Sequence, residues 1–336
     1  MLVSISSCLA SAPLPGPDAA LLDIDMHGLW HTFWHGAINT APDSPKLDWL
    51  ALHIIQAREQ GVVLIQGFKP DDASGERDRD RNNEPQAAVT FDGSLIWTDL
   101  PFLVPDMTAH WINESAAMSS AQRLSGAQFL AQLAAAGAAA DDALCGIALE
   151  VLREALETRR SLGPLIATDQ DSARQLRRLS VADLLPAANA WLFTAGRKLV
   201  QLSDAEREDR FPVEVGRLGE LIVSSDAAPS GRITGEAPRH GGFSPQRWTW
   251  WLHRLDEINS LAAGDVRKDE MGHGSEGLGS LVRGMMNNML LVAEQTNGPV
   301  REAVQRSNRL VSHRSPMQLL GPDRPAVSGT GSDGSS

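Results

Sequence analysis

The chain has 336 residues, of which 42% are hydrophobic, and its formal net charge is −12. This length allows a sizeable core, and the negative charge gives no general attraction for phosphate-rich partners, so nucleic-acid binding is not expected. Two cysteines, Cys8 and Cys145, cannot form a disulfide framework, and no apolar run reaches the roughly 18 residues of a membrane span, so no membrane association is expected.

Polar segments divide the chain into helical blocks. Residues 1–22 lack the basic start of a secretion signal, so we expect a disordered N-terminus and a cytoplasmic or nuclear protein. Insertions at about 71–90 and 224–242 and the tail 313–336 offer too little apolar surface to offset the entropy of ordering them. The sequence therefore predicts a single all-α globular domain over 23–312 with disordered insertions and a disordered tail.

Two helices are predicted at the start of this domain. Residues 25–38 place apolar side chains at helical spacing, and residues 44–61 do the same. In the second block Ser44 is a candidate N-cap, Pro45 occupies the first helical position and Gly61 ends the helix.

Three histidines recur every four residues along the first predicted helix, namely His27, His31 and His35. Imidazoles at this spacing share one flank of a helix and can chelate zinc. However, no glutamate lies between them, as it would in a hydrolytic zinc helix, and the row borders the apolar face. We therefore treat them as weak metal candidates and expect neither a metal nor another cofactor.

The segment 61–68, "GVVLIQGF", is ambiguous between a strand and a continued helix. A strand needs a partner, and the sequence offers no second run of this kind. We therefore expect little or no sheet.

A helical hairpin is predicted in the centre of the chain, from 120–137 and 141–161. Gly137 ends the first helix, and the acidic pair Asp141 and Asp142 lies at the positive start of the second. The acidic pair also resembles the start of the magnesium-binding motif of isoprenoid cyclases, although Cys145 stands where a further acidic residue would be. Helix-start electrostatics explains the pair without that chemistry.

The second helix of this hairpin carries an apolar stripe that includes Cys145, where a thiol is usually inert. By the same periodicity, Arg153, Glu157 and Arg160 are expected to lie off the stripe. A further helix is predicted over 180–203, and it begins with a near capping box.

Three tryptophans fall within four positions of a predicted helix that begins after Ser244. Helical periodicity places Trp248 and Trp251 on the core face, and it places Trp250 on the opposite face beside Arg254. Trp250 is therefore expected either to pack in a second layer or to contact a ligand or partner at the surface.

Two other motifs indicate no chemistry. The segment "GHGSEG" (272–277) matches a dinucleotide-binding pattern, but no strand precedes it, so a loop before a helix at about 280–295 is expected. The chain has no G-x-S-x-G nucleophile elbow.

Four segments, in the right order, resemble a fungal family of helical proteins known as domain of unknown function 3632. They are "SLIWTDLPFLVPDMTAHW", "FLAQLAAAG" with "ALCGIALEVLREALE", "LLPAANAWLFTAGRKLV" and "GFSPQRWTWWLHRLDEI", between about 45 and 295. The resemblance implies a helical, non-secreted fungal protein and assigns no activity or catalytic residue. The candidate binding residues are the aromatic and charged side chains Trp97, Asp99, Trp111, Trp250 and Arg254.

Two functions remain open. The leading hypothesis is an intracellular, non-catalytic protein-interaction or scaffolding role with a protein partner. The alternative is an enzyme or small-molecule binder with an aromatic pocket between helices, in fungal secondary metabolism. Polar groups converging on one cavity would favour the second, and a large apolar groove without titratable groups would favour the first.

Overall fold

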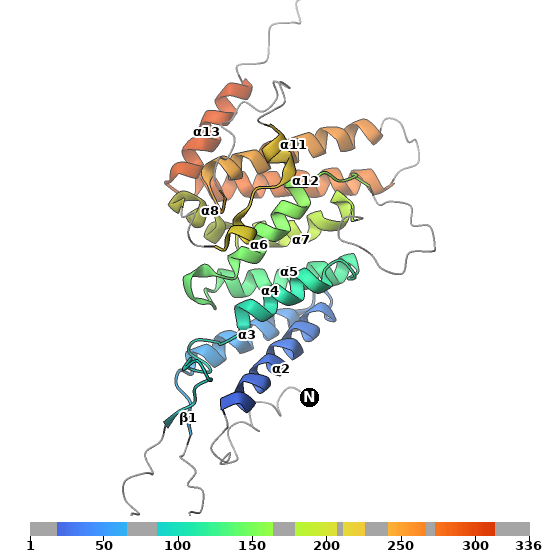
Figure 1. Cartoon of the computed structure of the whole chain (residues 1–336). Coiled ribbons are helices and arrows are strands. Elements are labelled where there is room, and N and C mark those ends of the chain that lie inside the picture. The colour runs from blue at the N-terminus through green and yellow to red at the C-terminus, as the bar shows by residue number, and fades with distance from the viewer. Residues whose placement is uncertain are drawn as a thin grey trace, which may run out of the picture.

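The structure is a computed structural model that describes residues 19–65, 86–163, 179–206, 211–225, 241–266 and 273–312. Its regular structure is almost entirely helical, which confirms the all-α prediction (Figure 1). In chain order the helices are α2 (Ala19–Ile38), α3 (Pro45–Glu59), α4 (Leu103–Glu114), α5 (Ser120–Ala135), α6 (Cys145–Leu152), α7 (Val181–Thr194), α8 (Gly196–Ala205), α9 (Val213–Gly216), α10 (Glu220–Ser225), α11 (Pro245–Val266), α12 (His273–Glu294) and α13 (Pro299–Ser312), with a 3-10 turn at Ala140–Asp142 (η1) and a π-helical turn at Arg153–Glu157 (η2).

Most of the segments predicted to be disordered lie outside the described residues, namely 1–18, 71–85, 226–240 and 313–336. Their edges belong to regular structure. Helix α2 begins at Ala19, four residues before the predicted start of the domain, and residues 86–90 include a short strand. The backbone N–H of Gly242 donates to the carbonyl of Gly216, so the end of the second insertion is tied to the core.

The helices stack in layers between the two ends of the molecule (Figure 1). At one end α2 contacts α3 and α4, and α5 packs on α2 and α3 with one side and on α7 with the other. Beyond α7 lie α12, α11 and α13. The helices α5 and α6 therefore follow one another in the chain, as predicted, but they do not pack mainly on each other, because the main partner of α5 is α7.

Close approach of α2 and α5 depends on a tryptophan facing a glycine. The Trp34 ring is fully buried, and a Cβ on Gly126 would lie 3.0 Å from it. One turn earlier, the buried Trp30 donates its indole N–H to the carbonyl of Pro101 at 2.6 Å. Both rings thus belong to the part of the core that α2 forms with α4 and α5.

The predicted helix ends agree with the structure at several places. The Ser44 side chain accepts from a backbone N–H of the first turn of α3, and Gly61 just beyond that helix has φ +74°. Ser180 and Asp183 form a complete capping box at the start of α7. These local signals fix helix limits because they satisfy backbone groups that the helix itself leaves unpaired.

Of the ambiguous segment at 61–68 the structure describes residues 61–65, in which Leu64–Ile65 form a strand (β1), while residues 66–68 lie outside the described residues. The strand pairs antiparallel with Gln86–Ala87 (β2). The partner is a single pair of residues rather than a run of β-branched residues, so the sequence pattern did not indicate it.

The block at 180–203 forms two helices where one was predicted. The helix breaks at Ala195, and the side chain of Asn288 from α12 donates to the carbonyl of Leu192, which the break leaves free, at 2.8 Å. Lys198 consequently lies in the first turn of α8 and pairs with Asp142 at 3.0 Å.

The prediction that Arg153, Glu157 and Arg160 lie off the buried stripe is wrong. All three side chains are buried. The π-helical turn η2 follows α6 directly and inserts an extra residue into the turn, which rotates the following side chains toward the interior.

Glu157 is the centre of a buried ion pair. Its two carboxylate oxygens accept from Nε and Nη2 of Arg247, at 2.7 and 3.0 Å, from the indole N–H of Trp251 at 2.7 Å and from the backbone N–H of Gly219 at 2.7 Å. Arg247 also donates to the carbonyls of Gly216, Arg217 and Gly242. Both side chains are fully buried, so the pair joins η2, α11 and the loop before α10.

The tryptophans of α11 all pack in the core. Trp248 and Trp251 are fully buried, as predicted, and Trp250 is also buried, with 4% of its surface exposed. Trp250 therefore belongs to a second packing layer. Contacts of α11 with α12 and with α13 explain why two faces of this helix are covered.

The segment 272–277 is mostly helical where a loop was predicted. Helix α12 begins at His273, within the glycine pattern. A glycine in a helix interior costs only about 1 kcal/mol relative to alanine, which the packing of α12 on α11 can offset.

Candidate functional site

The five candidate binding residues do not meet. Trp250 is buried in the core, and Arg254 pairs with Glu257 at 2.6 Å on the same helix. Trp97 is partly buried in the segment before α4, where the carboxylate of Asp99 accepts the backbone N–H of Leu95 at 2.8 Å. Within the described residues these four have packing or local hydrogen-bonding contacts, whereas Trp111 lines the pocket described next.

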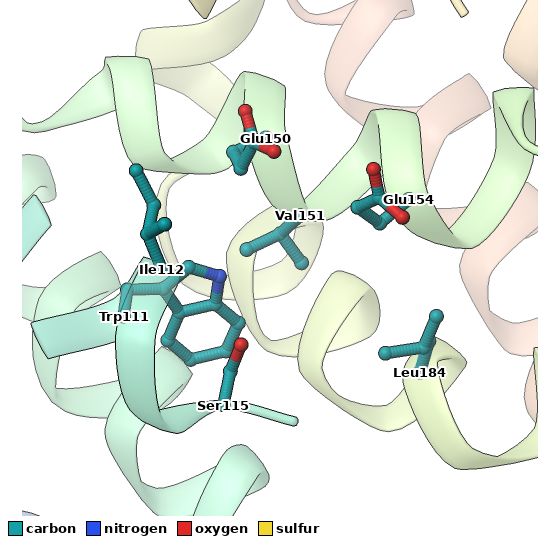
Figure 2. A pocket seen from close by; sticks show the side chains of 7 residues that line it. All are labelled: Trp111, Ile112, Ser115, Glu150, Val151, Glu154 and Leu184. Carbon is teal, nitrogen blue, oxygen red and sulfur yellow. The ribbon is translucent and has the colours of Figure 1, made fainter. Parts of the chain in front are cut away.

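The pocket lies between α4, α6, η2 and α7, and it is partly open to solvent. Figure 2 shows Trp111 on one side, facing the helix of Val151, with Leu184 across from it. The lining residues are Trp111, Ile112, Ser115, Glu150, Val151, Glu154 and Leu184. Its lining is mainly apolar, with a few polar groups, as in most small-molecule sites.

Two carboxylates line the α6 side of the pocket, and each is paired with an arginine. Glu150 bonds to Arg153 through one oxygen, and Glu154 bonds to Arg160 through one oxygen. In the part of the chain that the structure describes, the Oε1 atoms of Glu150 and Glu154 accept no hydrogen bond. Each of these two lining residues therefore keeps one carboxylate oxygen without a partner among the described residues, while its negative charge is balanced by an arginine.

Trp111 supplies the donor. Only 5% of this side chain is exposed, yet its indole N–H has no hydrogen-bond partner among the described residues. In Figure 2 the nitrogen lies on the edge of the ring that faces α6 across the pocket. An unpaired N–H at a mainly apolar wall is costly unless water or a ligand accepts from it.

Helix packing explains how these groups come together. Trp111 packs edge-on against Trp34 of α2, with ring centroids 6.4 Å apart, which orients the indole toward α6. The buried Arg153 also donates to the carbonyl of Val215 at 2.9 Å, which fixes the side chain that holds Glu150. Sequence reasoning identified Trp111 but missed the two glutamates, because nothing in their spacing distinguishes them from solvated charges on a helix.

The histidine row of α2 meets a fourth histidine on α4. Nδ1 of His27 forms a hydrogen bond with a carboxylate oxygen of Asp106 at 2.8 Å. The ring centroids of His31 and His35 lie 5.3 and 6.3 Å from the ring centroid of His110. In the described segments no group of three or more His, Cys, Asp or Glu side chains is arranged to hold a metal ion. The row instead contributes to the contact between α2 and α4.

Glu114 joins this cluster to the core. It accepts from the Trp34 indole N–H at 2.8 Å, and it bonds to Nδ1 of His110 at 2.6 Å. Burial raises the pKa of the Glu114 carboxyl, but these two hydrogen bonds and the nearby charges of His110 and His35 lower it below its usual value overall.

The remaining sequence candidates have structural roles. Cys145 is fully buried in α6. Asp141 and Asp142 lie in the turn η1 before α6, and the carboxylate of Asp142 pairs with Lys198. A described helix that is long and apolar enough to cross a membrane is not present.

Comparison with known proteins identifies the family of this chain. The family described as "Protein of unknown function (DUF3632)" matches residues 30–255. The "Oxopyrrolidines biosynthesis cluster protein G" of Penicillium oxalicum is 37% identical over 253 residues, which cover 74% of this chain and 64% of that relative. The chain thus matches less than two thirds of the relative's length, and no solved structure matches it. As the four sequence segments predicted, the chain belongs to the DUF3632 family.

Proposed function

We propose that this chain is a small-molecule-binding protein of fungal secondary metabolism, and that its binding site is the pocket at Trp111. The observation that carries the proposal is the unpaired indole N–H of Trp111. This residue is only 5% exposed and lies at the wall of the pocket. The wall combines this donor with two carboxylates and apolar surface, which is the composition of a binding site rather than of a plain packing defect.

The setting of the relative supports the same assignment. The relative's name places it in a cluster for oxopyrrolidine biosynthesis. A pocket that combines apolar surface with polar groups is compatible with a small-molecule-binding protein in that setting.

A second candidate is a protein-interaction role, and one surface favours it. On α3 the side chain of Trp49 is 57% exposed, Leu52 one turn further on is also exposed, and the ring of His53 lies 6.3 Å from that of Trp49. Exposed aromatic groups are enriched in protein interfaces. This surface belongs to the opposite face of α3 from its buried residues Leu47 and Ile54.

A fragment screen tests the first proposal. We expect ligand-observed NMR with small neutral and charged fragments to detect binding to the full chain at neutral pH. The variant Ile112→Trp should abolish it, because Ile112 is an exposed residue at the pocket and a larger ring there covers the mouth. The matched control Leu261→Trp adds the same ring to an exposed position on α11 and should bind as the natural chain does.

Fragments that bind equally well to both variants would contradict the pocket assignment. If, in addition, Trp49→Ala removed that binding, the α3 surface would be the functional one. A chain that binds no fragment at all would also contradict the proposal.

A further inference from the structure

Resting on the proposed function, we infer that the pocket at Trp111 selects neutral molecules that carry an amide, with the carbonyl accepting from the Trp111 indole and the N–H donating to Glu150 or Glu154. The lining residues carry one unpaired donor, the Trp111 indole N–H, and two carboxylate oxygens that accept no hydrogen bond from the described residues. An amide has one acceptor, the carbonyl oxygen, and one donor, the N–H, on the two atoms bonded to its carbonyl carbon, so a single small group supplies both partners.

Charge balance decides between an amide and an amine. Two glutamates at a pocket would by themselves favour a cation. Here each glutamate is paired with a buried arginine, Arg153 or Arg160, whose side chains are 4% and 1% exposed. The paired arginines offset the negative charge locally, while a cation entering the pocket would still lose its water. The site therefore favours a neutral donor over an ammonium group.

The apolar walls set the rest of the ligand. Ile112, Val151 and Leu184 surround the polar groups, so the amide is expected to carry a hydrocarbon ring or chain that covers them. A lactam combines both features, because its ring carbons adjoin an amide that has both a carbonyl and an N–H.

Four small probes of similar size separate these features. The probe 2-pyrrolidinone has both the carbonyl and the N–H, N-methyl-2-pyrrolidinone and cyclopentanone have only the carbonyl, and pyrrolidine is a cation at neutral pH. We expect 2-pyrrolidinone to bind most tightly, by roughly 10- to 100-fold over the two probes that have only the carbonyl, which is the effect of one hydrogen bond to a carboxylate. Two-dimensional NMR of the nine indole N–H groups measures this, with Trp111→Phe identifying the signal of Trp111.

Substitutions at the walls complete the test. Trp111→Phe keeps an aromatic ring but removes the donor, and it should weaken 2-pyrrolidinone binding by about 2- to 12-fold. The matched control Trp49→Phe changes an exposed indole on α3 and should leave binding unchanged. Glu150→Ala and Glu154→Ala remove the acceptors, so the variant that lacks the partner of the lactam N–H should weaken 2-pyrrolidinone binding by roughly 10-fold or more and leave cyclopentanone binding unchanged.

The outcomes separate the two proposals. If pyrrolidine binds best and Glu154→Gln abolishes its binding, the site is a cation site, and the amide inference is wrong although the binding function stands. If cyclopentanone binds as tightly as 2-pyrrolidinone, the glutamates take no part, and the inference is again wrong. If no probe moves the Trp111 signal and the fragment screen also finds no ligand, both proposals fail.

Discussion

Removing the carboxylate of Glu157 should destabilise the fold more than any other single change to a charged side chain. In Glu157→Ala the guanidinium of Arg247 stays buried without its counter-charge, which costs about 3–5 kcal/mol. The indole N–H of Trp251 and the backbone N–H of Gly219 lose their acceptor, at about 1 kcal/mol or more each. The sum of at least about 5 kcal/mol equals the whole stability of a marginal domain.

Urea denaturation followed by far-UV circular dichroism measures this loss. Glu157→Gln is the more tractable variant because it keeps the shape of the side chain and one acceptor oxygen. Its free energy of unfolding should lie between those of the natural chain and Glu157→Ala. The control Glu257→Gln removes a carboxylate from the ion pair with Arg254, where Glu257 is half-exposed, and should cost under about 1 kcal/mol.

Equal unfolding free energies for Glu157→Gln and Glu257→Gln would refute this reasoning. A double-mutant cycle adds a second check. Combining Glu157→Gln with Arg247→Met should cost less than the sum of the two single changes, because the double variant leaves no buried charge unpaired.

Three further outcomes are expected. Trp250→Ala should lower the free energy of unfolding by about 3–5 kcal/mol in urea denaturation, as much as Trp251→Ala, because both rings are buried. A decrease of under about 1 kcal/mol would instead place Trp250 at the surface. Burial lowers the pKa of His253, and the nearby Asp256 opposes this with a smaller effect. As the pH falls, the unfolded chain therefore binds a proton at this histidine at a higher pH than the folded chain does. The free energy of unfolding should consequently decline as the pH falls below about 6.5. The melting temperature of His253→Gln should fall less over this range, and an equal fall in both proteins would assign the effect to other groups. A chelator should leave the melting temperature unchanged, because the described residues contain no group of three or more His, Cys, Asp or Glu side chains arranged to hold a metal ion, and a drop reversed by zinc would reveal a metal site.

Local signals made much of the fold predictable. Ser44 and the Ser180–Asp183 box act within a few residues of the helix starts that they define, so the sequence alone contains the interaction. Apolar periodicity likewise identified the burial of Trp248 and Trp251, because one face of α11 meets the core in any packing of that helix.

Predictions were wrong where distant segments decide the outcome. The turn η2 departs from α-helical periodicity, and Glu157 at its end meets Arg247, which is 90 residues away in the chain. Trp250 is buried because α11 is covered on more than one face, which its own sequence does not reveal.

The candidate pocket was predictable only in part. Trp111 stood out through the segment that resembles the family, but the partners that make it a pocket come from three other elements. Glu150 and Glu154 lie four residues apart, a spacing that is common on solvated helix faces. Their place at a pocket follows from how α4, α6, η2 and α7 are arranged around it, which no local pattern encodes.

A crystal structure of the chain soaked with 2-pyrrolidinone tests the central claim most directly. We predict density for the probe in the pocket, with its oxygen within hydrogen-bond distance of the Trp111 indole nitrogen and its nitrogen near a carboxylate oxygen of Glu150 or Glu154. A pocket that stays empty, together with probe density on the α3 surface at Trp49, would contradict the claim.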